Sequence, residues 1–100
     1  MQIVGTRNTS GDGTAVIAAP GAGRRIVIHG IQLQAEADGD QTVLIKSGST
    51  TVYRFFMATK VQGIVRDLSG ENETDMRIYC GANEAVFVNL SAAVAMNYII

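Results

Sequence analysis

A glycine-rich loop followed at once by two arginines is the first feature that could carry chemistry. Its residues are Pro20, Gly21, Gly23, Arg24 and Arg25. A phosphate-binding loop works because a helix follows it and directs free backbone N–H groups at the anion. Here residues 24–35, "RRIVIHGIQLQA", are β-branched and alternate with period two, so no helix begins there. Pro20 presets its own φ and the glycines tolerate a positive φ, so we predict a tight turn between two strands.

The chain has one histidine, His29, and one cysteine, Cys80. His29 could act as a general base in a small hydrolase, but no serine or threonine stands out as its nucleophile. A zinc site would need further cysteine or histidine ligands. No basic neighbour lowers the pKa of Cys80, so we expect a buried, unreactive thiol. We therefore predict a protein that is not an enzyme and has no cofactor, no metal and no internal disulfide.

Three carboxylates alternate in the segment "EADGD", at Glu36, Asp38 and Asp40. Their spacing around a glycine faintly resembles a calcium loop, but the distal bidentate glutamate of such a loop is not in place. The alternative is a charged hairpin tip, in which Asp38 and Gly39 supply the turn. We favour the hairpin tip and leave calcium binding open.

The charge balance argues against nucleic acid and membrane as partners. Eight Lys and Arg residues stand against nine Asp and Glu, the net charge is −1, and the basic residues are scattered. A nucleic-acid footprint would need clustered basic residues. No apolar run has the length of a membrane span or of a signal-peptide core. We expect a complete, soluble chain that is made in a reducing cytoplasm.

The residue types favour strands throughout. Val, Ile, Thr, Tyr and Phe occur in short runs that Gly, Asn, Asp and Ser interrupt, and no segment sustains a helical apolar pattern. We therefore predict an all-β fold, an antiparallel, jelly-roll-like β-sandwich of eight or nine short strands in a single domain, residues 1–100. Residues 1–13 form either an N-terminal arm or an edge strand. The expected strands are 2–5, 14–19, 24–36, 41–46, 51–57, 61–66, 75–79, 84–91 and 94–100.

The alternation of the long strand 24–36 changes parity at His29 and Gly30. Ile26 and Ile28 share one parity, whereas Ile31, Leu33 and Ala35 share the other. A β-bulge with the glycine as its extra residue would keep both halves facing the core. Residues 32, 34 and 36 would then face water.

The composition predicts contacts with other molecules. The chain is 47% hydrophobic and only 17% charged, which is apolar for a domain this small. Where Val86, Val88 and Leu90 face the core, Phe87 must face outward, and two adjacent phenylalanines cannot share one face of a strand. The resulting interface candidates are Phe87, Phe55, Phe56, Leu44, Ile3 and Val4. We expect a homo-oligomer.

Three segments resemble a family of small tailed-bacteriophage virion proteins. They are "AVIAAPGAGRRIVIHGIQLQA" (15–35), "VLIKSGST" (43–50) and "GANEAVFVNLSAAVAMNYII" (81–100). Members of that family carry an "AAPGAGKRI" turn, a "KSGS" hairpin and a "GEALNLNLSAAV" strand near the C-terminus. The resemblance covers about half of the chain. It departs from the family at 61–79 and at Phe87, where the family tends to have a polar residue.

The resemblance implies a β-sandwich subunit, usually oligomeric, that is located on the virion after synthesis in the bacterial host. No catalytic residues come with it. Our leading hypothesis is a capsid decoration (cement) protein, a trimer that binds the major capsid protein and stabilises the shell. The alternative is a host-recognition domain of a fibre or spike, with Tyr53, Tyr79 and the segment 36–40 as candidates for holding a cell-surface glycan or protein.

Overall fold

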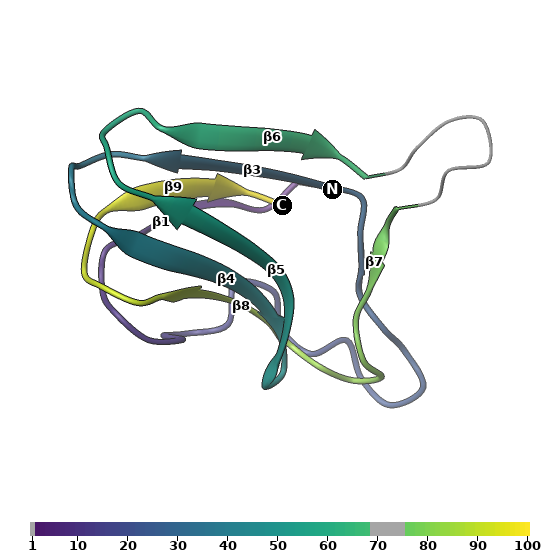
Figure 1. The fold of residues 1–100 in the computed structure, drawn as a ribbon. Coiled ribbons are helices and arrows are strands. Elements are labelled where there is room, and N and C mark those ends of the chain that lie inside the picture. Colours follow the sequence, from purple (N-terminus) through teal and green to yellow (C-terminus); the bar gives the residue numbers. More distant parts are fainter. Residues whose placement is uncertain (1, 69–75) are drawn as a thin grey trace.

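The computed structural model describes residues 2–68 and 76–100, and within them it contains nine strands and no helix (Figure 1). All strand pairs are antiparallel. The predicted all-β class, antiparallel pairing and number of strands are therefore confirmed. The strands are β1 (Val4–Arg7), β2 (Val27–Ile28), β3 (Gly30–Ala35), β4 (Gln41–Ser47), β5 (Thr50–Met57), β6 (Gly63–Asp67), β7 (Ile78–Tyr79), β8 (Val86–Leu90) and β9 (Met96–Ile99).

One sheet has four strands in the order β1-β9-β3-β6. Its strands alternate between buried and exposed side chains, as the period of two in the sequence requires. In β3, Ile31, Leu33 and Ala35 are buried, whereas Gln32 and Gln34 are exposed. This alternation gives the sheet one face toward the core and one face toward solvent.

A second sheet has three strands in the order β5-β4-β8. Its central strand, β4, alternates strictly, with Val43 and Ile45 fully buried and Leu44 half-buried between them. A tight hairpin joins β4 to β5, and Gly48 takes a φ of 57° there, a conformation that suits glycine. The predicted hairpin at 43–50 is thus present.

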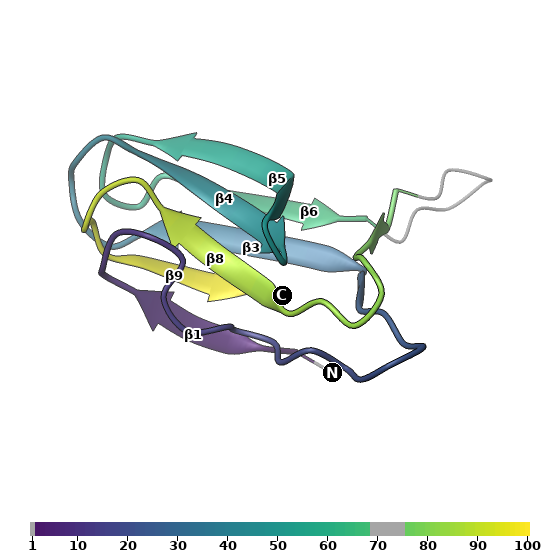
Figure 2. The same cartoon turned by 90° about the horizontal axis from the view of Figure 1, so that it is seen from below.

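The core is formed by side chains from both of these sheets, which lie as two layers in Figure 2. Each layer contributes the apolar half of its alternation, so neither sheet could bury this surface alone. The fully buried contributors include Leu33 and Met96 from the four-stranded sheet, and Val43, Ile45, Val86 and Val88 from the three-stranded sheet.

The predicted strand 14–19 is wrong as a strand, although the segment does run beside β8. Two isolated bridges join Gly11 to Leu90 and Ile17 to Val86. Between these bridges the chain departs from β8, and the Arg7 side chain fills the gap by donating from Nε to the carbonyl of Val88, 3.2 Å away. The buried edge of β8 therefore has hydrogen-bond partners without a continuous ladder.

The N-terminal residues form an edge strand, one of the two alternatives for 1–13. β1 pairs with β9 from Val4 opposite Ile99 to Arg7 opposite Met96. Gly5 faces Tyr98, whose ring occupies the space where a Cβ on Gly5 would lie. Glycine at this position therefore lets the aromatic ring pack inside the edge strand.

The long strand 24–36 is divided at His29. β2 pairs with β7 in a separate two-stranded sheet, whereas β3 pairs with β6 and β9. Ile28 and Ile31 are both buried, so the predicted change of parity is confirmed. The predicted role of the glycine as the extra residue is wrong, because Gly30 pairs with Asp67 and the interruption falls on His29. The change of pairing partner, from β7 to β6, explains the break.

The segment 36–40 is not a hairpin tip, which corrects that expectation. β3 and β4 belong to different sheets, so these residues connect one layer to the other. The segment "SGENE" (69–73), whose residue types predict a turn, lies outside the described residues, and so does the first residue of the strand expected at 75–79. In the parts of the chain that are described, no helix has the length and hydrophobicity to span a membrane.

Candidate interaction surfaces

The glycine-rich loop is a turn, as its sequence predicts. The Arg24 N–H donates to the carbonyl of Gly21 at 3.2 Å, and Gly21 and Gly23 have φ values of 107° and 75°. The Gly21 N–H is bound by the side-chain oxygen of Asn83 at 2.9 Å, so it is not directed at a ligand. The loop leads into β2 and not into a helix, so the geometry that makes a phosphate loop is missing at this place.

Cys80 is buried, as expected, and burial raises the pKa of its thiol. Ser47 lies beside it, and the Ser47 hydroxyl accepts the N–H of Gly81 at 2.9 Å and donates to Glu84 at 3.1 Å. A thiol that is both enclosed and protonated is a poor nucleophile. His29 is exposed at the other side of the strand break, on the rim of the cavity described below.

The three carboxylates of 36–40 do not converge. Among residues 2–68 and 76–100, no group of three or more His, Cys, Asp or Glu side chains is placed to hold a metal ion. Asp38 instead accepts the backbone N–H of Lys60 at 2.7 Å, which fastens the connection between the sheets to the turn before β6. The segment therefore has a structural contact in place of the calcium loop.

The outer face of the three-stranded sheet brings together three of the interface candidates. Phe56 projects from β5 and is 55% exposed, Leu44 lies on β4, and Phe87 lies on β8. Leu44 stands diagonally between the two rings, because Phe56 pairs opposite Thr42 and Phe87 opposite Lys46. Arg54, opposite Leu44, adds an exposed cation. We call this surface, with Phe56, Leu44, Phe87, Arg54 and Lys46, the aromatic face.

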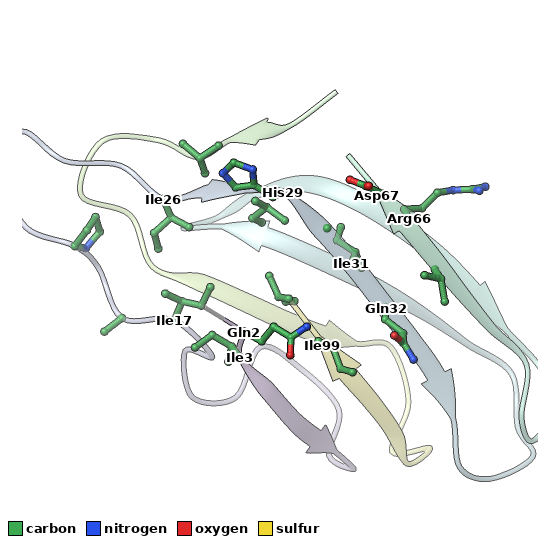
Figure 3. Close-up of a pocket in the computed structure, with 17 residues that line it drawn as sticks. Gln2, Ile3, Ile17, Ile26, His29, Ile31, Gln32, Arg66, Asp67 and Ile99 are labelled. Atoms are coloured by element: carbon green, nitrogen blue, oxygen red, sulfur yellow. The ribbon is translucent and has the colours of Figure 1, made fainter. Parts of the chain in front are cut away.

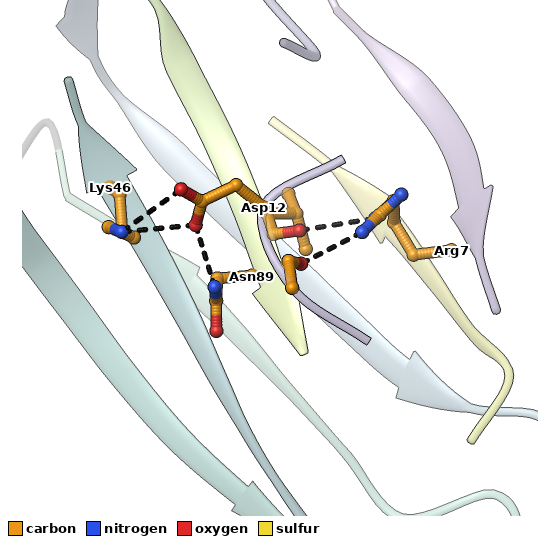
Figure 4. Close-up of polar contacts among 6 residues, drawn as sticks. Arg7, Asp12, Lys46 and Asn89 are labelled. Atoms are coloured by element: carbon orange, nitrogen blue, oxygen red, sulfur yellow. Dashed lines mark hydrogen bonds and ion pairs between the residues drawn. The ribbon is translucent and has the colours of Figure 1, made fainter. Parts of the chain in front are cut away.

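Phe55 points the other way and packs against the core, so Phe56 is the outward member of the pair. The register directs Phe87 outward, as predicted. Its side chain is nevertheless half-buried, so it is less exposed than the sequence pattern suggests. Both neighbours of Phe87 on this face, Lys46 and Asn89, are bonded to Asp12 (Figure 4).

Asp12 holds the loop 8–13 to the aromatic face. Its carboxylate accepts from Lys46 Nζ at 3.0 Å and from Asn89 Nδ2 at 2.6 Å. The hydrogen bond from Asn89, and then the bond and charge of Lys46, hold the pKa of Asp12 below its ordinary value. Arg7 also holds the loop 8–13, because its terminal nitrogen donates to the carbonyls of Thr9 and Gly11. We call Arg7, Asp12, Lys46 and Asn89 the polar clasp.

Two rows of uncharged residues cross the outer face of the four-stranded sheet, and Asp67, which pairs opposite Gly30, carries a charge in the row beside them. The register places Val4, Ile99, Gln32 and Val65 in one row across all four strands, and Thr6, Asn97, Gln34 and Gly63 in the next. Val4 and Val65 are 68% and 70% exposed. None of these eight side chains ionises, and a shallow hollow of about 270 Å³ lies between the rows. We call these two rows the neutral face.

A larger cavity, of about 690 Å³, lies where β9 ends between the starts of β1 and β3 (Figure 3). Isoleucine is the commonest residue in its walls, at seven of seventeen positions, and His29, Arg66 and Asp67 stand at one side. The cavity is continuous with the neutral face, because Gln32, Val65 and Ile99 line both. Its isoleucines are Ile3, Ile17, Ile26, Ile28, Ile31, Ile99 and Ile100.

Three further candidates are placed less favourably. Ile3 packs against the core and exchanges both backbone hydrogen bonds with Ile100, so little of it is available to a partner. Tyr53 also packs against the core. Tyr79 is exposed and stacks with Arg77, but it lies at the opposite end of the molecule from 36–40 (Figure 1). The three elements suggested for glycan binding therefore do not form one site.

The neutral face and the isoleucine cavity were missed by sequence reasoning. Gln32 and Gln34 were predicted to face water. The surface to which they belong, however, is determined by the strands that flank β3, and a local pattern does not reveal these. Val65 and Ile99 could be found only by register, because they come from opposite edges of β3. Comparison with protein-family models, with curated proteins and with solved structures finds no match for this chain. The fold and surfaces define the chain as an antiparallel all-β protein with two exposed sheet faces.

Proposed function

We propose that this chain is a virion structural protein, a decoration subunit that binds the assembled shell of a tailed bacteriophage and stabilises it. A subunit that binds the assembled shell but not the free shell protein raises the stability of the shell by its binding free energy. Several weak contacts made by one oligomer add as avidity. The partners are the major capsid protein and further copies of this chain, and three copies to the oligomer is the number that the family resemblance implies.

The strand order supports a jelly-roll assignment for the two layers. With the segment 11–17 counted beside β8, four elements in the order 11–17, β8, β4 and β5 face β1, β9, β3 and β6. The chain passes from one layer to the other after β1, after 11–17, after β3, after β5, between β6 and β8, and after β8. Two interlocked Greek keys have this order, and viral capsid domains are among the proteins that use it. The turn at 20–25 and the hairpin at 43–50, both carried by the phage resemblance, agree with it.

The observation that carries the proposal is the aromatic face. A phenylalanine that is 55% exposed stands on a regular strand beside Leu44 and Arg54, above a clasp that fixes the surrounding loop. Aromatic and arginine side chains are enriched where protein surfaces bind one another. We assign this face to the shell, because its mixture of rings and charges suits a different protein better than an identical copy.

Binding to shells tests the proposal. Shells of the encoding phage that lack this protein are mixed with the purified chain, sedimented and assayed for bound protein. We expect saturable binding by the wild type and at least a tenfold loss of affinity for Phe56→Ser, since central aromatic anchors dominate interfaces. Met76→Ser is the matched control, because Met76 is similarly exposed but lies off this face. Binding of the wild type to host cells and not to shells would replace the proposal with the host-recognition function.

A further inference from the structure

We infer that the neutral face is where two copies of this chain associate. The proposed function needs copies to associate but does not say where. The inference rests on it only for the expectation that copies associate. A face that meets itself pairs two copies, so this contact is separate from the three-fold association that the resemblance implies. The two outer faces differ in charge, and that difference is what identifies the partner of each.

Charge is the first reason to assign a second copy to this face. An identical surface brings identical charges, and like charges brought together are costly. The two rows of the neutral face avoid this cost, because they contain only Val, Ile, Thr, Asn, Gln and Gly, and the charged residues Arg66 and Asp67 lie beyond them at the cavity. If two aromatic faces met, Arg54 of one copy would approach Arg54 and Lys46 of the other copy. An identical copy is therefore tolerated on the first face and disfavoured on the second.

Hydrogen bonding is the second reason. Gln32 and Gln34 are exposed at the centre of the neutral face, next to Asn97 of β9. A primary amide carries both donors and an acceptor, so the same amide on another copy is a matching partner. Thr6 already donates to Asn97 at 2.8 Å, which fixes the orientation of one amide before any contact forms. The polar groups of this face can thus be satisfied by themselves across a two-fold axis.

Shape is the third reason. The exposed valines, Val4 and Val65, stand at the two edges of the face, and the hollow of about 270 Å³ lies between the rows. A protruding side chain of an identical face can enter this hollow. The continuous isoleucine cavity extends the apolar surface beyond the rows, through Gln32, Val65 and Ile99. The ridges and the hollow occur on the same face, as a self-complementary contact requires.

The area sets the strength that we expect. Four strands about 4.8 Å apart and about five residues long cover about 300 Å² of plane. A standard interface buries about 800 Å² on each partner. The two rows alone therefore cover less than half of a standard interface. Association in solution should therefore be weak and depend on concentration, and a shell that holds copies close together would strengthen it.

The test compares two lysines on matched edge strands. β6 and β5 each form an edge of their sheet, and Val65 and Phe56 project outward from them. Lysine is well tolerated on edge strands. Sedimentation velocity is measured on the full chain from micromolar to submillimolar concentration. We expect the wild type to associate, Val65→Lys to raise the dissociation constant about tenfold or more, and Phe56→Lys to leave it unchanged. Thermal unfolding of each variant reports that it is folded, and Val4→Thr, which keeps the shape of valine, serves as a milder second variant.

Three results would overturn the inference: a wild type that stays monomeric over the whole range, a folded Val65→Lys variant that associates like the wild type, or an equal loss in Phe56→Lys. The proposed function fails separately. If the wild type associates through the neutral face but does not bind shells, the surface assignment stands and the virion role falls. If the Phe56→Lys variant loses shell binding and the Val65→Lys variant loses self-association, both are supported.

Discussion

The two sheets contribute to one core, yet their outer faces are built on different principles. The aromatic face combines rings with Arg54 and Lys46, and the chain itself braces it through Asp12. The neutral face has no ionisable group in its two rows, and Thr6 and Asn97 are joined there by a side-chain hydrogen bond. Because successive side chains of a strand point to opposite faces, an outward residue can change without changing the core. Two surfaces with different chemistry can therefore be built on one fold.

Because the two faces differ in charge, shell binding and self-association should respond differently to salt. Charged contacts weaken as salt screens them, whereas contacts between uncharged side chains do not. Shell binding through the aromatic face should therefore decrease with salt, and association through the neutral face should stay constant. This contrast is independent of any substitution, and it can be measured on the wild type alone.

The largest effect that we expect comes from Arg7, which belongs to the four-stranded sheet but supports the aromatic face. Arg7→Met removes the donors to the carbonyls of Val88, Thr9 and Gly11. Hydrogen bonds from a charged donor contribute about 1.5–3 kcal/mol each, and partial exposure reduces that, so we expect a loss of about 2 kcal/mol. Urea unfolding measures it. Shell binding should fall with it because the loop is released, and an unchanged unfolding midpoint would show that the clasp is not a support.

The next effect tests the neutrality of the other face. Gln32→Glu keeps the shape of the side chain but places one charge at the centre of each contacting copy. We expect the dissociation constant for self-association to rise about tenfold at neutral pH. Lowering the pH below about 4.3, the ordinary value for glutamate, should restore association because the carboxyl becomes neutral. Sedimentation velocity at both pH values measures this, with the wild type as control. A loss that persisted at low pH would mean that shape, and not charge, is responsible.

Much of the fold could be predicted from the sequence, because alternation and turns are local properties. The parity change around His29, the hairpin at Gly48 and the turn at 20–25 all followed from residue types. The strand at 14–19 and the hairpin at 36–40 could not be predicted correctly. In both cases local sequence was compatible with a strand or a turn, and the pairing partner decided the outcome. Pairing depends on distant segments that a local pattern does not contain.

The candidate surfaces divide in the same way. Phe56, Leu44 and Phe87 could be nominated because a large apolar residue at an outward position is visible within one strand. Their convergence on a single face is a property of the register. The row of Val4, Ile99, Gln32 and Val65 draws on four strands, and its members look unremarkable one at a time. Asp12 was missed because its partners, Lys46 and Asn89, are far away in the sequence.

A smaller effect should distinguish the faces by pH. The pKa of Asp12 is lowered in the folded chain by Asn89 and then by Lys46, from an ordinary value of 3.8. A lowered pKa contributes stability above the unfolded value, and that stability is lost as the pH falls through the folded value. As the pH falls below 3.8, the urea midpoint of the wild type should therefore decrease more steeply than the urea midpoint of the Asp12→Asn variant. Parallel curves would mean that Asp12 adds nothing to the clasp.

The smallest effect that we expect is a gain in association. Thr6→Val replaces a hydroxyl on the neutral face with a methyl group, and it removes the 2.8 Å bond to Asn97. Because the position is exposed, stability should change by no more than about 0.5 kcal/mol. Burying the methyl group between copies should strengthen self-association about threefold. Thr51→Val is the matched control, since Thr51 is exposed opposite Lys46 on the aromatic face. A gain in the control that equals the gain in Thr6→Val would show that added hydrophobicity acts anywhere on the surface, and the neutral face would lose its claim to be the contact between copies.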